Sequence, residues 1–154
     1  MDRLENLRRV IDAILLQQSD LEERRVAYIH LYGVSATCVL LAKKRGLDPQ
    51  LSAAAGMLHD IATYRTGDPS GHAKRSSVEA EEILTRIGGF NGEEIREVCS
   101  AILTHSAKPA VHGPLAELLK DADVLEHHLY NPGFEVVWKE RLQRVFEELG
   151  LEIE

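Results

Sequence analysis

Residues 51–60 read Leu51-Ser52-Ala53-Ala54-Ala55-Gly56-Met57-Leu58-His59-Asp60, a run of small and apolar side chains that ends in a histidine and an aspartate. Few of these side chains are suited to contact with water, so we expect a central, buried helix over residues 50 to about 62. Neighbouring side chains leave a helix about 100° apart. His59 and Asp60 are therefore expected to face one cation together from the end of that helix.

Apolar residues recur at helical spacing on both sides of this run. Ser19 opens a long predicted helix that extends to about residue 45, in which Gly33 leaves open a break near His30. No segment alternates like a strand, so we predict a single all-α domain of about seven helices over residues 1–154. Other helices are expected over residues 4–15, from His72 to residue 87, from Asn91 to His105, from Leu115 to His128, and from Asn131-Pro132 to Leu149 with Phe134 and Trp138 as core anchors.

Composition narrows the class of protein. The 154 residues suffice for one well-buried core but not for two. A net charge of −7 and the lack of a long Lys/Arg run argue against a nucleic-acid polymer as partner. Cys38 and Cys99 lie in predicted helices and are read as buried thiols of a reducing compartment. Without a signal peptide or about 18 consecutive apolar residues, the chain is predicted to be cytoplasmic, with no membrane partner; a homodimer stays open.

Two further motifs flank the His-Asp pair: His30 precedes it, and Asp-Ala-Asp follows at residues 121–123. This order resembles the HD-domain superfamily of metal-dependent phosphohydrolases, and the resemblance covers about residues 28–128. It implies that His30, His59, Asp60 and Asp123 bind a divalent metal. Their chemistry agrees, because imidazoles and carboxylates at the ends of buried helices need a cation or another partner. The alternative is that the histidines are satisfied within the core and Asp123 only caps a helix.

Two more histidines suggest a second ion. His72 and His105 resemble the additional ligands of binuclear members of this superfamily, in which the aspartate of the pair bridges two metals. The resemblance thus implies His72, His105 and a bridging Asp60 around a second ion about 3.5–4 Å from the first. Fe, Mn, Co, Ni, Zn or Mg are all candidates for the metal. In the alternative interpretation, His72 is a loop or N-cap residue and His105 ends its helix as a cation facing the helix dipole.

The sequence departs from the family pattern after the pair. Many members carry a lysine where this chain has Thr63, whose hydroxyl can hydrogen-bond a phosphate but carries no charge. The positive charge must then come from elsewhere, and we favour Lys74 and Arg75 because they follow His72 closely. Thr63, Lys74 and Arg75 are the predicted substrate-binding residues. Arg65 and Lys108 are the other candidates.

For the residues next to Asp123 in the sequence, the preferred interpretations place them outside the metal site. Asp121 lies about 160° from Asp123 around a helix, so only one of them can face the site, and the family pattern selects Asp123. His127 could support a ligand, but a surface pair with His128 is the preferred interpretation. Glu126 is expected to face solvent.

The resemblance implies a phosphomonoesterase or phosphodiesterase that cleaves a nucleotide or another small phosphorylated metabolite through a metal-activated hydroxide. His59 and Asp60 are the predicted catalytic residues. Two other classes stay open: a di-iron oxygenase with similar ligands, and a regulator that binds a metal or nucleotide without turnover.

Overall fold

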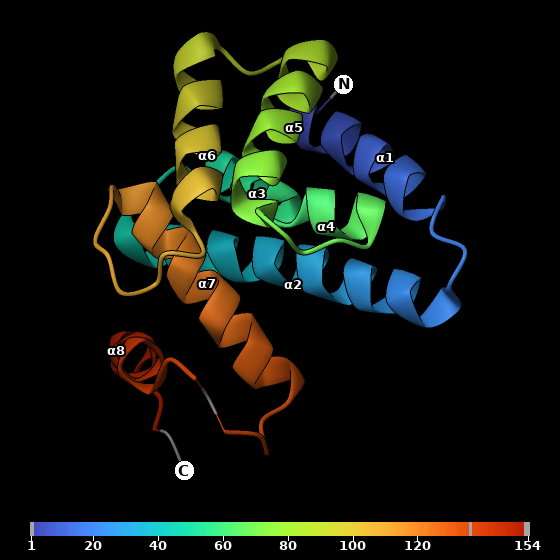
Figure 1. Cartoon of the computed structure of the whole chain (residues 1–154). Coiled ribbons are helices and arrows are strands. Elements are labelled where there is room, and N and C mark those ends of the chain that lie inside the picture. Colours follow the sequence, from blue (N-terminus) through green and yellow to red (C-terminus); the bar gives the residue numbers. More distant parts are fainter. Residues whose placement is uncertain (1, 136, 153–154) are drawn as a thin grey trace.

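The computed structural model describes residues 2–135 and 137–152, and these residues form eight helices and no strand (Figure 1). The predicted all-α class is confirmed. The helices are α1 (Arg3–Leu15), α2 (Leu21–Arg45), α3 (Pro49–Leu58), α4 (Ile61–Thr66), α5 (His72–Ile87), α6 (Gly92–Thr104), α7 (Pro114–Tyr130) and α8 (Lys139–Leu149).

Helix α3 is the centre of the bundle. It contacts α1, α2, α5, α6 and α7, and every residue from Leu51 to Leu58 is buried. Figure 1 shows the long α2 running beneath it, α7 crossing α2, and α8 lying below α7, against which it packs. The small and apolar run therefore forms the buried central helix that its composition predicts.

Small residues in α3 let its backbone approach α2 closely. A Cβ atom added to Gly56 would lie 2.6 Å from Cα and 2.7 Å from the backbone nitrogen of Ser35, closer than real Cβ contacts allow. The Ser35 hydroxyl donates a hydrogen bond of 3.0 Å to the carbonyl of Ala53 at the same crossing. Gly56 therefore sets the distance between the two helices.

Polar caps define several helix ends as the sequence predicts. Asp48 accepts hydrogen bonds from the backbone nitrogens of Gln50 and Leu51, so α3 begins at Pro49. Asn91 and Glu94 form a reciprocal capping box at the start of α6. Helix α2 differs in detail, because its N-cap is Asp20 and not Ser19.

The predicted continuation of α3 to about Ala62 is wrong. Helix α3 ends at Leu58, His59 is its C-cap, and Asp60 has φ −118° and ψ 16° before α4 begins at Ile61. The backbone thus changes direction between the two residues of the His-Asp pair, and both helix ends present a side chain to the same region.

The expected start of the last helix at Asn131-Pro132 is also wrong. Residues 131–134 and 137–138 form bends and turns, and α8 begins only at Lys139. Phe134 is 74% exposed and Trp138 is 39% exposed, so neither anchors the core. Apolar residues recur at helical spacing in this segment, but Pro132-Gly133 disfavours a helix, and the side chains of Phe134 and Val137 are largely exposed.

Helix α2 has the length and composition of a membrane span, the one such helix in the described part of the chain. Half of its apolar window is buried within the fold, where it packs against α3 and α7. It is continuous through Gly33, so the break that this glycine left open does not occur. We interpret α2 as a core helix.

Replacing Gly56 by alanine tests the close approach of α2 and α3. We expect the added methyl group to lower the free energy of unfolding by about 1–3 kcal/mol, because the atoms it meets belong to the backbone of α2, which cannot move aside easily. Urea denaturation measures the change. Gly113→Ala is the control, since an added Cβ there meets nothing within 4 Å; equal stability of the two variants would contradict this packing.

Candidate metal centre

Three elements bring the first predicted ligands together. His30 comes from the middle of α2, His59 and Asp60 from the break between α3 and α4, and Asp123 from α7. His30 Nε2 lies 3.0 Å from His59 Nε2, and each of these nitrogens is 3.3 Å from Asp60 Oδ2. Asp123 Oδ1 lies 3.6 Å from His30 Nε2 and 3.7 Å from His59 Nε2. The four donor atoms enclose one small volume.

A second group lies on the other oxygen of Asp60. Nε2 of His72, at the start of α5, is 3.4 Å from Asp60 Oδ1, and Nε2 of His105, the C-cap of α6, is 3.2 Å from the same oxygen. The two nitrogens are 3.3 Å apart. Each oxygen of the Asp60 carboxylate thus faces its own pair of imidazoles.

Hydrogen bonds to backbone carbonyls on the far side of the ring fix three of the four imidazoles. Nδ1 of His59 lies 2.7 Å from the carbonyl of Gly56, and Nδ1 of His105 lies 2.7 Å from that of Ile102. His72 Nδ1 is 3.1 Å from the carbonyl of Pro69. Carbonyl oxygens only accept, so Nδ1 carries a proton in all three rings, and Nε2 is free for another partner.

In these tautomers the facing Nε2 atoms of His30 and His59 are both hydrogen-bond acceptors, so they cannot bond to each other. The Nδ1 of His30 donates to a carboxylate, so His30 Nε2 and His59 Nε2 face each other as lone pairs unless a cation or proton lies between them. Asp60 Oδ1 and Asp123 Oδ1 are buried and have no hydrogen-bond donor within residues 2–135 and 137–152. A buried donor set of this kind fits a divalent metal ion.

The pKa values show how strongly this cluster attracts positive charge. Burial lowers the pKa of His59, but the carboxylates of Asp60 and Asp123 outweigh burial and raise it to about 10. Burial opposes ionisation of Asp60, yet the neighbouring histidines hold its pKa well below the usual range. The pKa of His30 is also raised, because Asp60 and Glu126 outweigh its burial. In His105 burial prevails and lowers the pKa.

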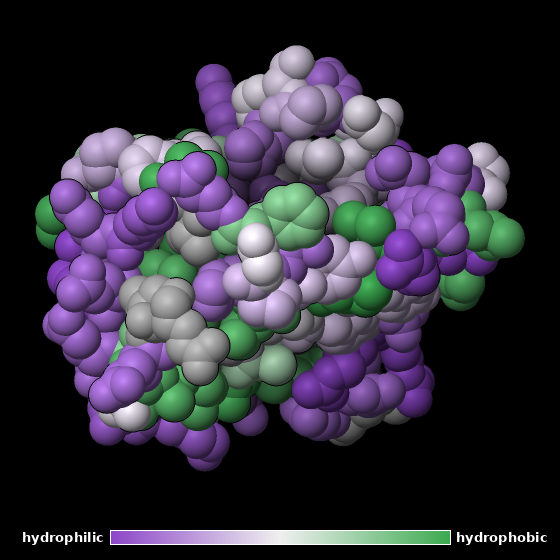
Figure 2. Space-filling model, turned by 90° about the horizontal axis from the view of Figure 1, so that it is seen from below, coloured by the Kyte–Doolittle hydropathy of each residue, from purple (hydrophilic) through white to green (hydrophobic). Residues whose placement is uncertain are grey.

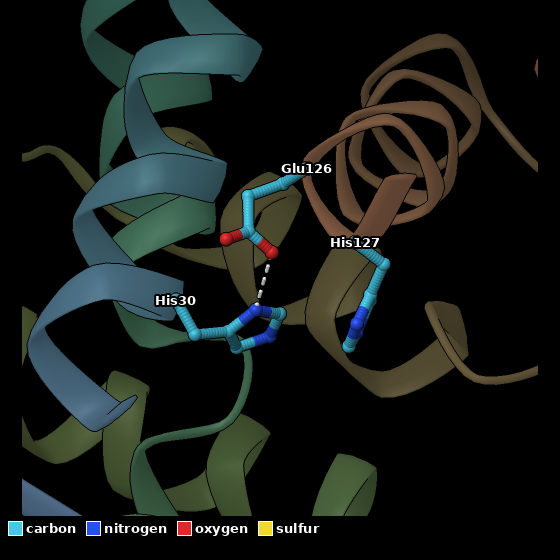
Figure 3. A group of neighbouring side chains, drawn as sticks. All are labelled: His30, Glu126 and His127. Carbon is cyan, nitrogen blue, oxygen red and sulfur yellow. Dashed lines mark hydrogen bonds and ion pairs between the residues drawn. The ribbon is translucent and has the colours of Figure 1, made fainter. Parts of the chain in front are cut away.

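Glu126 supports His30, so the expectation that it faces solvent is wrong. It is buried, and its Oε2 accepts a hydrogen bond of 2.8 Å from His30 Nδ1 (Figure 3). A Cβ atom at Gly33 would lie 3.0 Å from Cγ and 3.1 Å from Oε1 of Glu126. Gly33 therefore makes room on α2 for the carboxylate that orients His30. The i+3 spacing from Asp123 was the signal in the sequence, since residues three apart share a helix face.

Two cationic or basic groups flank Asp123. Lys108 is buried, and its Nζ donates to Asp123 Oδ2 at 2.6 Å and to the carbonyl of His105 at 2.7 Å. His127 is exposed, as preferred from the sequence, yet its Nε2 is 3.4 Å from Asp123 Oδ1. Figure 3 shows its ring, from α7, beside that of His30.

Asp121 points to the opposite side of α7, as its spacing from Asp123 predicts. Its carboxylate accepts hydrogen bonds from Arg45 at 2.6 Å and from Arg141 at 2.7 Å. Arg45 also pairs with Glu148. Asp121 thus ties α2 and α8 to α7, while Asp123 faces the cluster.

The predicted substrate-binding residues lie around α4 and α5. The Arg75 guanidinium binds within the loop before α5, donating to Thr66 Oγ1 at 2.7 Å and to the carbonyls of Asp68 and Ser70. Lys74 is exposed beside it, and Thr63 is half-buried. Arg65 pairs with Glu79. A substrate contact by Thr63, Lys74 or Arg75 stays a prediction.

Comparison with protein families identifies the HD domain in this chain. The profile of the HD domain matches residues 27–127, a range that contains both groups of ligand candidates as well as Lys108 and Glu126. No curated protein and no solved structure matches the chain.

The support of His30 by Glu126 is tested by Glu126→Gln. We expect about a 10–100-fold loss of metal affinity, because the neutral amide no longer raises the basicity of the imidazole. Isothermal titration with Mn²⁺ or Zn²⁺ measures the affinity. Gly33→Ala should act in the same direction by displacing the carboxylate.

Glu97→Gln is the matched control for this pair of variants, since Glu97 is exposed on α6. Thermal unfolding of the metal-free variants separates loss of affinity from loss of fold. Unchanged affinity in a folded Glu126→Gln protein would show that the hydrogen bond does not matter to the site.

Proposed function

Because the chain belongs to the HD-domain family, we propose that it is a metal-dependent phosphohydrolase acting on a nucleotide or another small phosphorylated metabolite. The observation that carries the proposal is the division of the Asp60 carboxylate between two pairs of imidazoles. A shared carboxylate between two groups of nitrogen donors is the arrangement by which proteins hold two metal ions for hydrolysis.

In this proposal each half of the cluster holds one divalent ion. His30, His59, Asp60 and Asp123 would hold the first, and His72, His105 and the shared Asp60 would hold the second. When bound, such ions lower the pKa of water and offset charge that develops on phosphoryl oxygens. Hydrolysis adds the hydroxyl of water to phosphorus, breaks the bond to the leaving oxygen and returns a proton to that oxygen.

The residues of the chain fix the geometry for this reaction. Backbone carbonyls and Glu126 hold the imidazoles in one tautomer and orientation, so little reorganisation is needed when substrate arrives. Lys108 holds Asp123 and adds a buried positive charge beside it. That charge supports a role for Lys108 in offsetting the charge of a phosphate, the role for which the sequence favoured Lys74 and Arg75.

Substitution of the shared ligand tests the two-ion arrangement. We expect Asp60→Asn to lose both ions and all phosphatase activity, whereas His72→Ala should lose only the second and keep about one ion per chain. Elemental analysis after loading with Mn, Fe, Co, Ni or Zn counts the ions, and phenyl phosphate hydrolysis reports activity. Asp20→Asn is the control, because asparagine caps a helix as well as aspartate.

Retention of one ion by Asp60→Asn would reduce the proposal to a single metal. A folded wild-type protein that binds no metal, or that hydrolyses no phosphate ester after loading with any of these metals, would exclude the phosphohydrolase. Oxygen uptake by the iron-loaded protein without phosphate release would favour the oxygenase instead.

The raised pKa of His59 predicts that metal binding releases a proton. At neutral pH the ring carries a proton in the metal-free protein, because its pKa is about 10, and a metal ion must displace it. Apparent affinity should therefore rise with pH, by about tenfold per unit below that value. Calorimetry in buffers of different ionisation enthalpy counts the protons; no release between pH 6 and 8 would contradict the shift.

A further inference from the structure

We propose that the segment between α7 and α8 forms a specificity pocket for an aromatic or similarly flat apolar group, attached to the phosphate that reacts at the cluster. The proposal rests on the proposed function, because it assigns the substrate of that same site. Trp138 and Phe134 are the residues that select the group.

The pocket is continuous with the candidate metal centre. A cavity of about 370 Å³ is lined by Lys108, Asp123 and His127 of the cluster region together with Val124, Phe134 and Trp138. Its volume lies in the range of small-molecule sites, which is about 300–1,000 Å³. A phosphate held near Asp123 and Lys108 would therefore extend its substituent toward Trp138. Two larger hollows adjoin this segment: one of about 860 Å³ contains no residue of the cluster, and one of about 1050 Å³ shares Lys108 and Trp138 with the pocket but contains no metal-ligand candidate.

The apolar wall of this pocket is not required by the fold. Phe134 and Trp138 lie in a segment of turns and stay partly or largely exposed, while the buried core is complete without them. Figure 2, which views the molecule from the side of α8, shows hydrophobic residues gathered on this face among hydrophilic ones. Exposed aromatic side chains beside a polar reaction site are typical of a binding site.

The polar groups of the pocket agree with such a substrate. Lys108 and His127 lie at the end toward the cluster, where the phosphate would be. Asn131 and Glu135 also line the pocket, and they offer an amide and a carboxylate to the edge of a flat ring. The polar side chains of the lining provide orientation, while the aromatic faces of Phe134 and Trp138 provide area.

Trp138 is the only tryptophan of the chain, so ligand binding can be followed by its fluorescence. The probes are benzylphosphonate, which has no cleavable phosphate ester, and methylphosphonate, which carries the same charge without the ring. With the Zn²⁺-loaded protein we expect benzylphosphonate to change the emission of Trp138 and to bind about tenfold more tightly than methylphosphonate. Phe134→Ala should reduce this difference, and Leu16→Ala, which removes another exposed apolar side chain, should not.

Activity gives a second measurement. Trp138→Ala should raise KM for phenyl phosphate about tenfold with little change in KM for methyl phosphate. Circular dichroism should show an unchanged fold, because both aromatic side chains contribute little to the core.

The possible outcomes test the pocket and the phosphohydrolase reaction separately. Equal binding of the two phosphonates, or equal KM for the two esters in wild type and Trp138→Ala, would overturn the pocket and leave the phosphohydrolase standing. Selective binding of benzylphosphonate without hydrolysis of any ester would support the pocket and exclude the reaction. If Phe134→Ala converts a dimer into a monomer and leaves benzylphosphonate binding unchanged, the face is an interface between two copies and the proposal is wrong.

Discussion

Asp60 lies between two pairs of imidazoles, and much of the fold serves to hold it there. A carboxylate removed from water is unfavourable unless positive charge or hydrogen-bond donors surround it. Here the surrounding rings come from α2, from the end of α3, and from α5 and α6, so four separate parts of the chain must meet at one side chain. The break between α3 and α4 is a consequence: Asp60 lies between two helix ends rather than on the side of one helix.

Gly56 links the packing of the core to the orientation of the cluster. Its missing side chain allows α3 to approach Ser35 of α2, and its carbonyl accepts the hydrogen bond from Nδ1 of His59. The distance between α2 and α3 and the direction of the His59 ring therefore depend on the same residue. A shift at this crossing would also change the separation of His59 from His30, which α2 carries.

Much of this arrangement could be predicted from the sequence, and the failures have physical reasons. The structure brings together the six residues for which the resemblance to the HD-domain superfamily implied metal binding. The helices that carry them could be predicted because helical spacing and cap residues are local properties of the chain. Glu126 was misplaced because an acidic residue is usually solvated, and only the space above Gly33 in another helix makes its burial favourable. Lys108 lies in a loop, where no periodicity indicates which way a side chain points. The start of α8 was misplaced because apolar spacing continues through Phe134 and Trp138, although these side chains do not pack into the core.

The position of Asp60 between the two pairs of imidazoles affects how metal ions would bind there. Because each oxygen of Asp60 faces its own pair of imidazoles, an ion bound in one half would change both the charge and the freedom of the ligand that the other half needs. The two halves are therefore coupled, and this coupling is reciprocal whatever its sign. Two such metal sites would not bind their ions independently, because the occupancy of each would depend on that of the other. Partial loading would then yield a mixture of species set by cooperativity rather than by two separate affinities.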